Sequence, residues 1–168
     1  AKAALAKEGL EFAENLPLGV MIEVPAAVRL IPRLAAEVDF FSVGTNDLVQ
    51  YLLAADRNNQ LVSKHYDPLH PAVQSVLKEA CRSAAAKGKP ICLCGEMATD
   101  PMTLLPLLGM GMREFSIPAP FIPRIKAFLS KISLEQAIRC QIRISQMDTS
   151  TQIRSYLEGL LSKVGADL

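Results

Sequence analysis

The sequence predicts an α/β protein whose strands form a parallel sheet. Four short apolar runs recur along the chain, each ends in polar or glycine-containing sequence, and a segment with helical spacing follows each run. Strands and helices that alternate in this way indicate parallel strands joined by right-handed crossovers. The runs are continuous rather than alternating, which predicts strands buried on both faces. A length of 168 residues fits one domain with a substantial core.

The predicted strands are residues 18–24, 39–47, 89–96 and 114–119. Helices are predicted over residues 25–38, 47–57, 71–88, 100–111 and 120–132. Proline at the start of the first helix, and lysine with glycine at the end of the third, fit helix termini. We expect the fourth helix to be kinked or broken at Pro106. After residue 133 only helices are predicted, over 133–147 and 150–164, and Ser133 is expected to cap the first of them.

The composition excludes several classes of function. A net charge of +1 with 21% charged residues gives no electrostatic footprint for nucleic acid or for an anionic membrane. The longest nearly uncharged stretch, PMTLLPLLGMGM (101–112), is too short to span a bilayer, so no membrane insertion is expected. The first residues are not those of a secretory signal, and no initiator methionine is present. We therefore expect the chain to begin inside a longer protein.

The cysteines predict a reduced protein. They stand at positions 81, 92, 94 and 140 and form no C-x-x-C pair. Cys92 and Cys94 share one face of a predicted strand, because side chains alternate with period two. The histidines, His65 and His70, are not placed to complete a zinc site, and neither is expected to be catalytic; His70 is predicted near the start of a helix and close to Tyr66. A cytoplasmic protein with free thiols is favoured over a disulfide or metal framework.

Polar side chains collect at the ends of the predicted strands. The first strand ends at Glu23, the second at Thr45-Asn46-Asp47, the third at Cys94-Gly95-Glu96 and the fourth near Ser116. In α/β barrels the catalytic groups stand at the carboxyl ends of successive strands. Four strand ends that carry polar groups are therefore typical of a functional site.

Residue type suggests a role for four of these side chains and their neighbours. Glu23 and Asp47 suit a hard cation such as Mg²⁺, which takes one or two carboxylates together with waters and phosphate oxygens. Asp47 is equally placed to cap the following helix. Arg57 suits a phosphate or a carboxylate, although loop arginines are commonly solvated. Asn46 suits a phosphate oxygen, and it also fits ordinary turn chemistry.

Four motifs together resemble a known family. GVMIEVPAA (19–27), DFFSVGTNDLVQYLLAADRNN (39–59), HPAV (70–73) and CLCGEMATDP (92–101) are similar to the C-terminal, phosphoenolpyruvate-binding domain of enzyme I of the bacterial sugar phosphotransferase system. The paralogue of the nitrogen-regulatory branch has the same core, and the sequence does not separate the two. The likeness spans about residues 16–132, including LLGMGMREFSIPAPFIPRIK (107–126).

The resemblance implies a fold and a domain organisation. The family adopts a TIM-type (β/α)8 barrel, and this chain looks like its second half, strands five to eight, plus the C-terminal helices. Residues 1–132 would be the C-terminal half of the phosphoenolpyruvate-binding barrel, and residues 133–168 a helical segment of the same domain. The first half of the barrel and the N-terminal domain with its phosphoacceptor histidine are missing. The sequence therefore looks like a fragment.

The resemblance also implies roles for individual residues. Glu23 and Asp47 match the family's Mg²⁺ ligands, and Asn46 and Arg57 match its contacts to the phosphoryl group. Cys94 matches the cysteine that protonates the methylene carbon of enolpyruvate. A thiol is a suitable acid there, because an ordinary pKa near 8.5 leaves it protonated at neutral pH. The other three cysteines are interpreted as structural.

The implied reaction moves phosphoryl from phosphoenolpyruvate to a protein histidine with Mg²⁺ and releases pyruvate. The phosphoryl group then passes to a small histidine-containing phosphocarrier protein, which docks on the missing N-terminal domain. A cytoplasmic homodimer is expected, serving either sugar transport or the nitrogen-regulatory branch, and the isolated fragment is expected to be inactive. Two alternatives remain open: a dimerisation and regulatory module that senses a ligand, or a fragment of pyruvate phosphate dikinase or phosphoenolpyruvate synthase.

Overall fold

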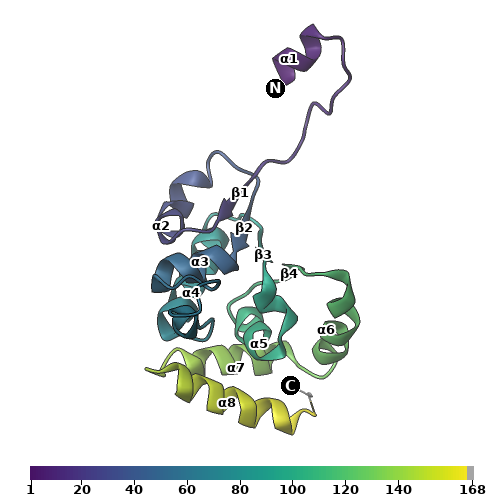
Figure 1. Cartoon of the computed structure of the whole chain (residues 1–168). Coiled ribbons are helices and arrows are strands. Elements are labelled where there is room, and N and C mark those ends of the chain that lie inside the picture. Colours follow the sequence, from purple (N-terminus) through teal and green to yellow (C-terminus); the bar gives the residue numbers. More distant parts are fainter. Residues whose placement is uncertain (166–168) are drawn as a thin grey trace.

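A computed structural model describes residues 1–165 and places four strands in one sheet (Figure 1). The strands are β1 (Gly19–Ile22), β2 (Phe40–Gly44), β3 (Ile91–Cys94) and β4 (Glu114–Ser116). They lie in the order β1-β2-β3-β4, and every neighbouring pair is parallel. The predicted α/β class and its parallel sheet are confirmed, with each strand shorter than its apolar run.

Helices connect and surround the strands. They are α1 (Lys2–Lys7), α2 (Pro25–Leu34), α3 (Thr45–Leu53), α4 (Pro71–Ala86), α5 (Pro101–Gly109), α6 (Ile122–Leu129), α7 (Leu134–Ile144) and α8 (Ser150–Lys163), with 3-10 turns at Ser63–His65, Glu96–Thr99 and Ala119–Phe121. The sequence did not predict α1, which stands apart from the sheet at the end of an extended segment (Figure 1). The predicted C-terminal segment runs to residue 168, and its residues 166–168 lie outside the described part of the chain.

The helix starts follow from the sequence. A proline occupies the first turn of α2, α4 and α5, where its missing N–H is no loss. His70 is the N-cap of α4, and its Nδ1 accepts a hydrogen bond from the backbone N–H of Ala72 at 3.2 Å. Ser133 caps α7 as predicted, and its partner in the capping box is Gln136. Local chemistry thus sets these boundaries.

One predicted boundary is wrong, and one of two alternatives predicted for a helix is excluded. The second strand ends at Gly44, because α3 begins at Thr45; Asp47 therefore lies inside the first turn of α3 and does not cap it. Of the kink or break predicted at Pro106, the break does not occur, because Pro106 lies within α5. Residues 101–107 are all buried, and this burial offsets the hydrogen bond that proline removes from a helix interior.

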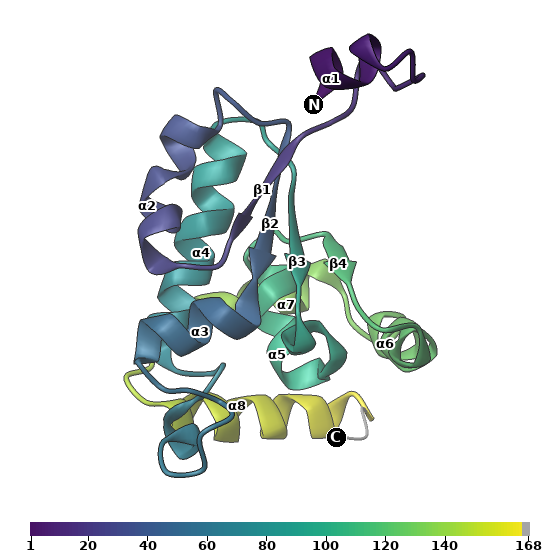
Figure 2. The ribbon, with the colours of Figure 1, turned by 45° about the horizontal axis from the view of Figure 1, so that its top comes forward.

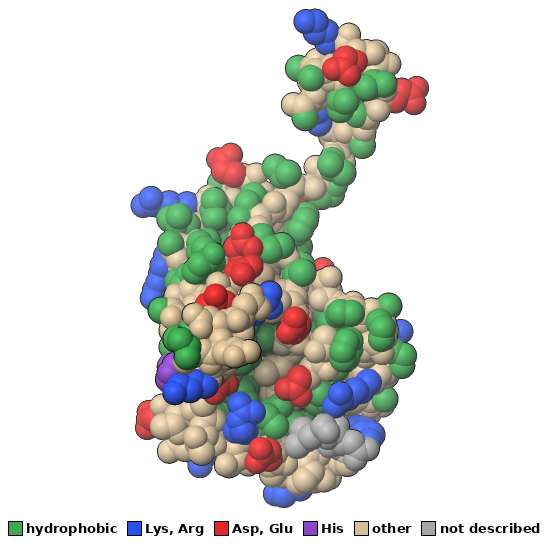
Figure 3. All heavy atoms as spheres, viewed as in Figure 1, with side chains coloured by type: hydrophobic (Ala, Val, Ile, Leu, Met, Phe, Trp, Pro, Cys, Tyr) green, Lys and Arg blue, Asp and Glu red, His purple; other side chains and the backbone are tan. Residues whose placement is uncertain are grey.

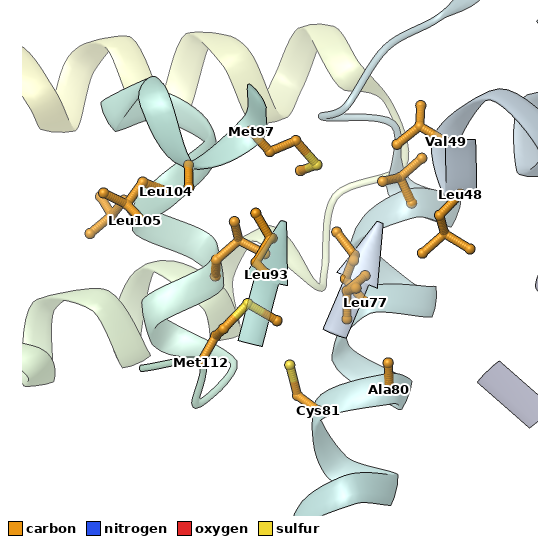
Figure 4. Close-up of a cluster of buried hydrophobic side chains, with 14 of the residues drawn as sticks. Leu48, Val49, Leu77, Ala80, Cys81, Leu93, Met97, Leu104, Leu105 and Met112 are labelled. Atoms are coloured by element: carbon orange, nitrogen blue, oxygen red, sulfur yellow. The ribbon is translucent and has the colours of Figure 1, made fainter. Parts of the chain in front are cut away.

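The core lies on one face of the sheet. Phe41, Val43 and Leu93 point to this face and are 0% exposed. Leu93 of β3 lies between Leu77 of α4 and Leu104 of α5 in the core (Figure 4). Figure 2 shows α2 and α4 side by side, next to the strands. One layer of helices therefore covers this face.

The opposite face of the sheet is bare, which corrects the expectation of strands buried on both faces. Met21 is 46% exposed, Glu114 and Ser116 are exposed, and Cys92 and Cys94 are only half-buried. These residues alternate with the core residues along their strands, as the period of two requires. Continuous apolar runs misled the prediction, because within residues 1–165 no second layer covers this face.

Helices α7 and α8 cover α5. Gly109 at the end of α5 allows a close approach: a Cβ at this position would lie 2.2 Å from the carbonyl oxygen of Ala137 in α7. The buried face of α8 adds Ile153, Leu157 and Leu161 to the same core. Among residues 1–165 no helix has both the length and the apolar character to cross a bilayer, including the apolar α5.

Candidate active site at the strand ends

The carboxyl ends of the strands form one row. The register pairs Gly44 with Cys94, and Cys94 with Ser116. Glu23 follows the last paired residue of β1, which places it level with Gly44. A Cβ at Gly44 would lie only 3.1 Å from the Cβ of Glu23. The structure therefore brings the predicted residues that follow β1, β2 and β3 to the same end of the sheet, the end where the strands finish.

Two hydrogen bonds join the segments that follow β2 and β3. The side-chain oxygen of Asn46 accepts from the backbone N–H of Glu96 at 3.3 Å. The buried hydroxyl of Thr45 donates to the carbonyl oxygen of Cys94 at 3.4 Å. Gly95 lies between them at φ 140°, and a Cβ there would lie 2.3 Å from the Thr45 hydroxyl oxygen. Only glycine fits this conformation and this spacing.

Arg57, in the loop after α3, lies at the same end of the sheet. Its backbone N–H donates to the side chain of Gln50 at 3.4 Å, and its Nη1 lies 3.7 Å from the Glu96 carboxylate. The two side chains of this ion pair are 35% and 80% exposed, so the pair is worth little in water and is easily exchanged for another anion. Arg57 is therefore a paired residue rather than a freely solvated one.

Tyr66 reports on the electrostatics of the site. Burial raises the pKa of Tyr66, the nearby Arg57 guanidinium partly lowers it, and the Glu96 and Asp47 carboxylates raise it further. The phenol thus lies in the field of residues from three different segments. Arg57, Glu96 and Asp47 consequently share one neighbourhood.

Glu23 and Asp47 have oxygens available for a cation. Both side chains are half-buried, and neither makes a hydrogen bond or an ion pair with another residue in the described range 1–165. No group of three or more histidine, cysteine or acidic residues in that range could hold a metal. Two carboxylates fit Mg²⁺, which draws its other ligands from water and phosphate oxygens.

The cysteines fall into two pairs, and all four are free thiols. Cys94 is half-buried at the site, and its register neighbour Gly44 has no side chain to cover it. Cys92 lies two residues earlier on the same face. Burial raises the pKa of Cys81 to about 11 and that of Cys140 to about 12, so these two are unreactive.

Thr45, Glu96 and Tyr66 belong to the site, although the sequence assigned them no role. Thr45 and Glu96 belong to the strand-end motifs, and their positions beside Asn46 and near Cys94 could have indicated that they belong to the site. Tyr66 comes from the segment between α3 and α4, and only the tertiary fold brings it near Asp47. Figure 3 shows acidic and basic side chains around a hollow between α3 and α6.

Comparison with known proteins identifies relatives over nearly the whole chain. Residues 1–134 match the family model described as "PEP-utilising enzyme, PEP-binding domain". The phosphoenolpyruvate-protein phosphotransferase of Haemophilus influenzae is 42% identical over 160 residues, which are 95% of this chain and 28% of the relative. That of Geobacillus stearothermophilus is 38% identical over 161 residues, which are 96% of this chain and 28% of the relative.

A third relative carries a different name. The "phosphoenolpyruvate-dependent phosphotransferase system" protein of Escherichia coli K12 is 41% identical over 148 residues, 88% of this chain and 20% of the relative. The chain therefore spans less than a third of the length of each of these relatives.

Proposed function

This chain belongs to the PEP-utilising enzymes, as their PEP-binding domain, and we propose that it binds phosphoenolpyruvate at the carboxyl ends of β1, β2 and β3. One observation carries the proposal: Glu23 and Cys94 are level with Gly44 at neighbouring strand ends, and a hydrogen bond from Glu96 to Asn46 joins the segments after β2 and β3. This row lies at the end of the sheet where α/β proteins bind their ligands.

The topology supports a half-barrel as the architecture. Each strand lies next to its sequence neighbour, as in a singly wound barrel, and helices cover one face only. In a closed barrel the other face would point inward and meet further strands. We therefore assign the chain to strands five to eight of a (β/α)8 barrel within a longer phosphotransferase, as the 28% coverage of its relatives suggests.

Glu23 and Asp47 are the residues that would hold Mg²⁺. Glu23 directly follows β1 and Asp47 lies in the first turn of α3, just after β2; neither carboxylate has a protein partner within residues 1–165, as a cation site requires. When bound, Mg²⁺ neutralises charge on the transferring phosphoryl group. At Asp47 the N-terminus of α3 also favours a negative charge.

Asn46 and Arg57 would orient the substrate. The oxygen of Asn46 is occupied by Glu96, which leaves its amide nitrogen to donate to a phosphate oxygen. Arg57 would exchange its exposed pairing with Glu96 for the more highly charged phosphate, which a guanidinium binds through two parallel hydrogen bonds. Transfer of phosphoryl is mostly positioning and charge neutralisation, so these contacts supply much of the catalysis.

Cys94 would complete the reaction as the acid. When the phosphoryl group leaves, the P–O bond breaks and its electron pair stays on the bridging oxygen, which gives the enolate of pyruvate. The S–H bond of Cys94 breaks, its proton forms the new C–H bond at the methylene carbon, and the thiolate takes a proton back from water. The bare face of the sheet gives the thiol access to the substrate.

The whole protein would then be a phosphoenolpyruvate-protein phosphotransferase, the name its relatives carry. The phosphoryl acceptor would be a histidine on a domain outside this chain, and a small histidine-containing carrier protein would receive the group next. We place this enzyme in the cytoplasm as a homodimer of the phosphotransferase system, in its sugar branch or its nitrogen branch.

Calorimetric titration of phosphoenolpyruvate into the full-length protein tests the site. We expect binding that strengthens with Mg²⁺ and that falls at least about tenfold in Arg57→Ala, because a phosphate loses a charged hydrogen bond. Arg33→Ala, an exposed arginine on α2, is the matched control and should bind normally. Equal affinity in wild-type protein and Arg57→Ala would place the substrate elsewhere.

A further inference from the structure

A second cavity lies away from the strand ends, between α4 and α7. Its volume is about 420 Å³, within the range of small-molecule sites, which starts near 300 Å³. None of the strand-end residues lines it; the first three turns of α4 and the last turn of α7 do. The cavity is therefore separate from the proposed phosphoenolpyruvate site.

Two buried glutamines form part of the wall. Gln74 of α4 is 5% exposed and Gln141 of α7 is 6% exposed. The amide nitrogen of Gln74 donates to the carbonyl oxygen of Pro68 at 2.9 Å, but its side-chain oxygen is buried without a donor among residues 1–165. Buried polar atoms are nearly always hydrogen-bonded, so this oxygen calls for a donor that the described chain does not supply.

Positive charge gathers on the same side of α4. Lys78 and Arg82 also line the cavity, and together with Gln74 they occupy every fourth position on one helix face. The one carboxylate in the wall, Glu79, is neutralised by Arg29 at 2.8 Å. Gln74, whose side-chain oxygen has no partner within residues 1–165, therefore lines the cavity about one helix turn before Lys78 and about two turns before Arg82.

We propose that this cavity binds a small organic anion that carries a neutral hydrogen-bond donor, such as a hydroxyl group, at the end opposite its carboxylate. The donor would satisfy Gln74, and the carboxylate would lie between Lys78 and Arg82. Successive positions on this face are about 6 Å apart along the helix axis, which suits a chain of about six carbons. Ile144 and Met147 provide an apolar wall for its methylene groups.

A pair of matched probes tests the site: 6-hydroxyhexanoate and hexanoate, which differ only in the terminal hydroxyl. Saturation-transfer NMR on the full-length protein would measure both affinities. We expect 6-hydroxyhexanoate to bind about fivefold more tightly, because only its hydroxyl can satisfy the buried oxygen. Gln74→Met should abolish this difference, since methionine keeps the length of the side chain but has no acceptor oxygen.

Arg82→Gln should weaken both probes at least fivefold, because both carry the carboxylate. This exposed position can be changed without disturbing the core, so it tests the proposal even if Gln74→Met is poorly folded. Lys87→Gln, at the end of α4 and outside the cavity, is the matched control and should change neither affinity. Absence of binding at about 10 mM, or equal binding of both probes to wild-type protein, would overturn the proposal. The proposal does not rest on phosphoenolpyruvate binding, and phosphoenolpyruvate titrations report separately on that site.

Discussion

The side-chain oxygen of Asn46 accepts a hydrogen bond from the backbone N–H of Glu96 at 3.3 Å, which ties the start of α3 to the turn after β3. The side chain of Asn46 therefore has two roles in the proposed site. Its oxygen holds two loops together, and its amide nitrogen is left for the substrate.

Asn46→Asp separates the two roles of Asn46. Aspartate keeps the acceptor for the Glu96 N–H but replaces the donor by a negative charge. We expect phosphoenolpyruvate affinity to fall at least about tenfold, since a charged hydrogen bond is lost and a repulsion is gained. The urea midpoint should hardly move. Asn15→Asp, at an exposed position in the segment before β1, controls for the added charge. A large loss of stability with unchanged affinity would contradict this division.

Asp47→Ala in the full-length enzyme should abolish Mg²⁺-dependent phosphoryl transfer, which a coupled pyruvate assay measures. Folding should stay near normal, because Asp47 contributes only a favourable charge in the first turn of α3, worth about 0.3–1 kcal/mol. Asp148→Ala, an exposed acid far along the chain, is the matched control. Activity within tenfold of wild type would show that Asp47 is not a metal ligand.

Cys94→Ala should leave phosphoenolpyruvate and Mg²⁺ binding intact while slowing pyruvate formation by orders of magnitude, because only the proton donor is removed. Cys92→Ala lies on the same face two residues earlier and should be a mild packing change of about 1–2 kcal/mol. Calorimetry and stopped-flow pyruvate detection separate the two outcomes. Similar effects from both substitutions would refute the distinction between these thiols.

Two buried thiols make the protein sensitive to alkaline pH. Burial raises the pKa of Cys81 to about 11 and that of Cys140 to about 12, from an ordinary value of 9.0. The unfolded chain ionises at lower pH than the folded one, so the stabilisation is complete below pH 9 and is lost as pH rises toward 11–12. Each thiol should cost about 1 kcal/mol of unfolding free energy between pH 9 and pH 10.

Urea unfolding at about pH 8 and about pH 10 measures this loss of stability. Its size follows from the difference between the pKa of each thiol in the folded and in the unfolded chain. In Cys140→Ala the unfolding free energy should depend less on pH than in the wild type, because a buried thiol is removed. In Cys92→Ala, which removes a half-buried thiol, it should depend on pH more strongly than in Cys140→Ala. Parallel pH profiles for the two variants would exclude the buried thiol as the source.

The 168-residue chain should not persist alone as an ordered monomer at micromolar concentration. β1 and β4 are the edges of the sheet, and unpaired edges are templates for association. We expect a dimer, formed edge to edge, or a partly molten state, with no turnover of phosphoenolpyruvate. Analytical ultracentrifugation and a pyruvate-release assay check this. A compact, cooperatively unfolding monomer would refute the edge argument.

Sequence reasoning located every strand because each apolar run ends in distinct loop chemistry. It placed Glu23 and Cys94 at strand ends, and register brings both level with Gly44. It also placed Asn46 there, although Asn46 lies in α3 and reaches the site through its hydrogen bond with Glu96.

Sequence reasoning missed the contact of Arg57 with Glu96, since a pairing across 39 residues depends on the loop after α3 rather than on any local pattern. Nothing in the sequence indicated that Tyr66 belongs to the site, because its proximity to Asp47 and Glu96 depends on the tertiary fold.

The burial of the strands was misjudged for a different physical reason. Composition records how apolar a strand is, but not whether a second layer exists to cover it. Met21 and Cys92 lie on the bare face although both stand in apolar runs. Sequence reasoning also left a kink or a break open at Pro106; no break occurs, because burial of the whole helix outweighs one missing hydrogen bond.

The close approach of Gly109 in α5 to Ala137 in α7 makes α7 part of the same packed core as the sheet. The family match stops at residue 134, where α7 begins. A protein trimmed at that point would lose the apolar faces of α7 and α8 and leave α5, buried from residue 101 to 107, facing water. The truncation would remove four large buried aliphatic side chains, Ile144, Ile153, Leu157 and Leu161. At about 1.5–3 kcal/mol each, their burial contributes a free energy comparable to the whole stability of an ordinary domain. Truncation there would unfold the protein rather than shorten it.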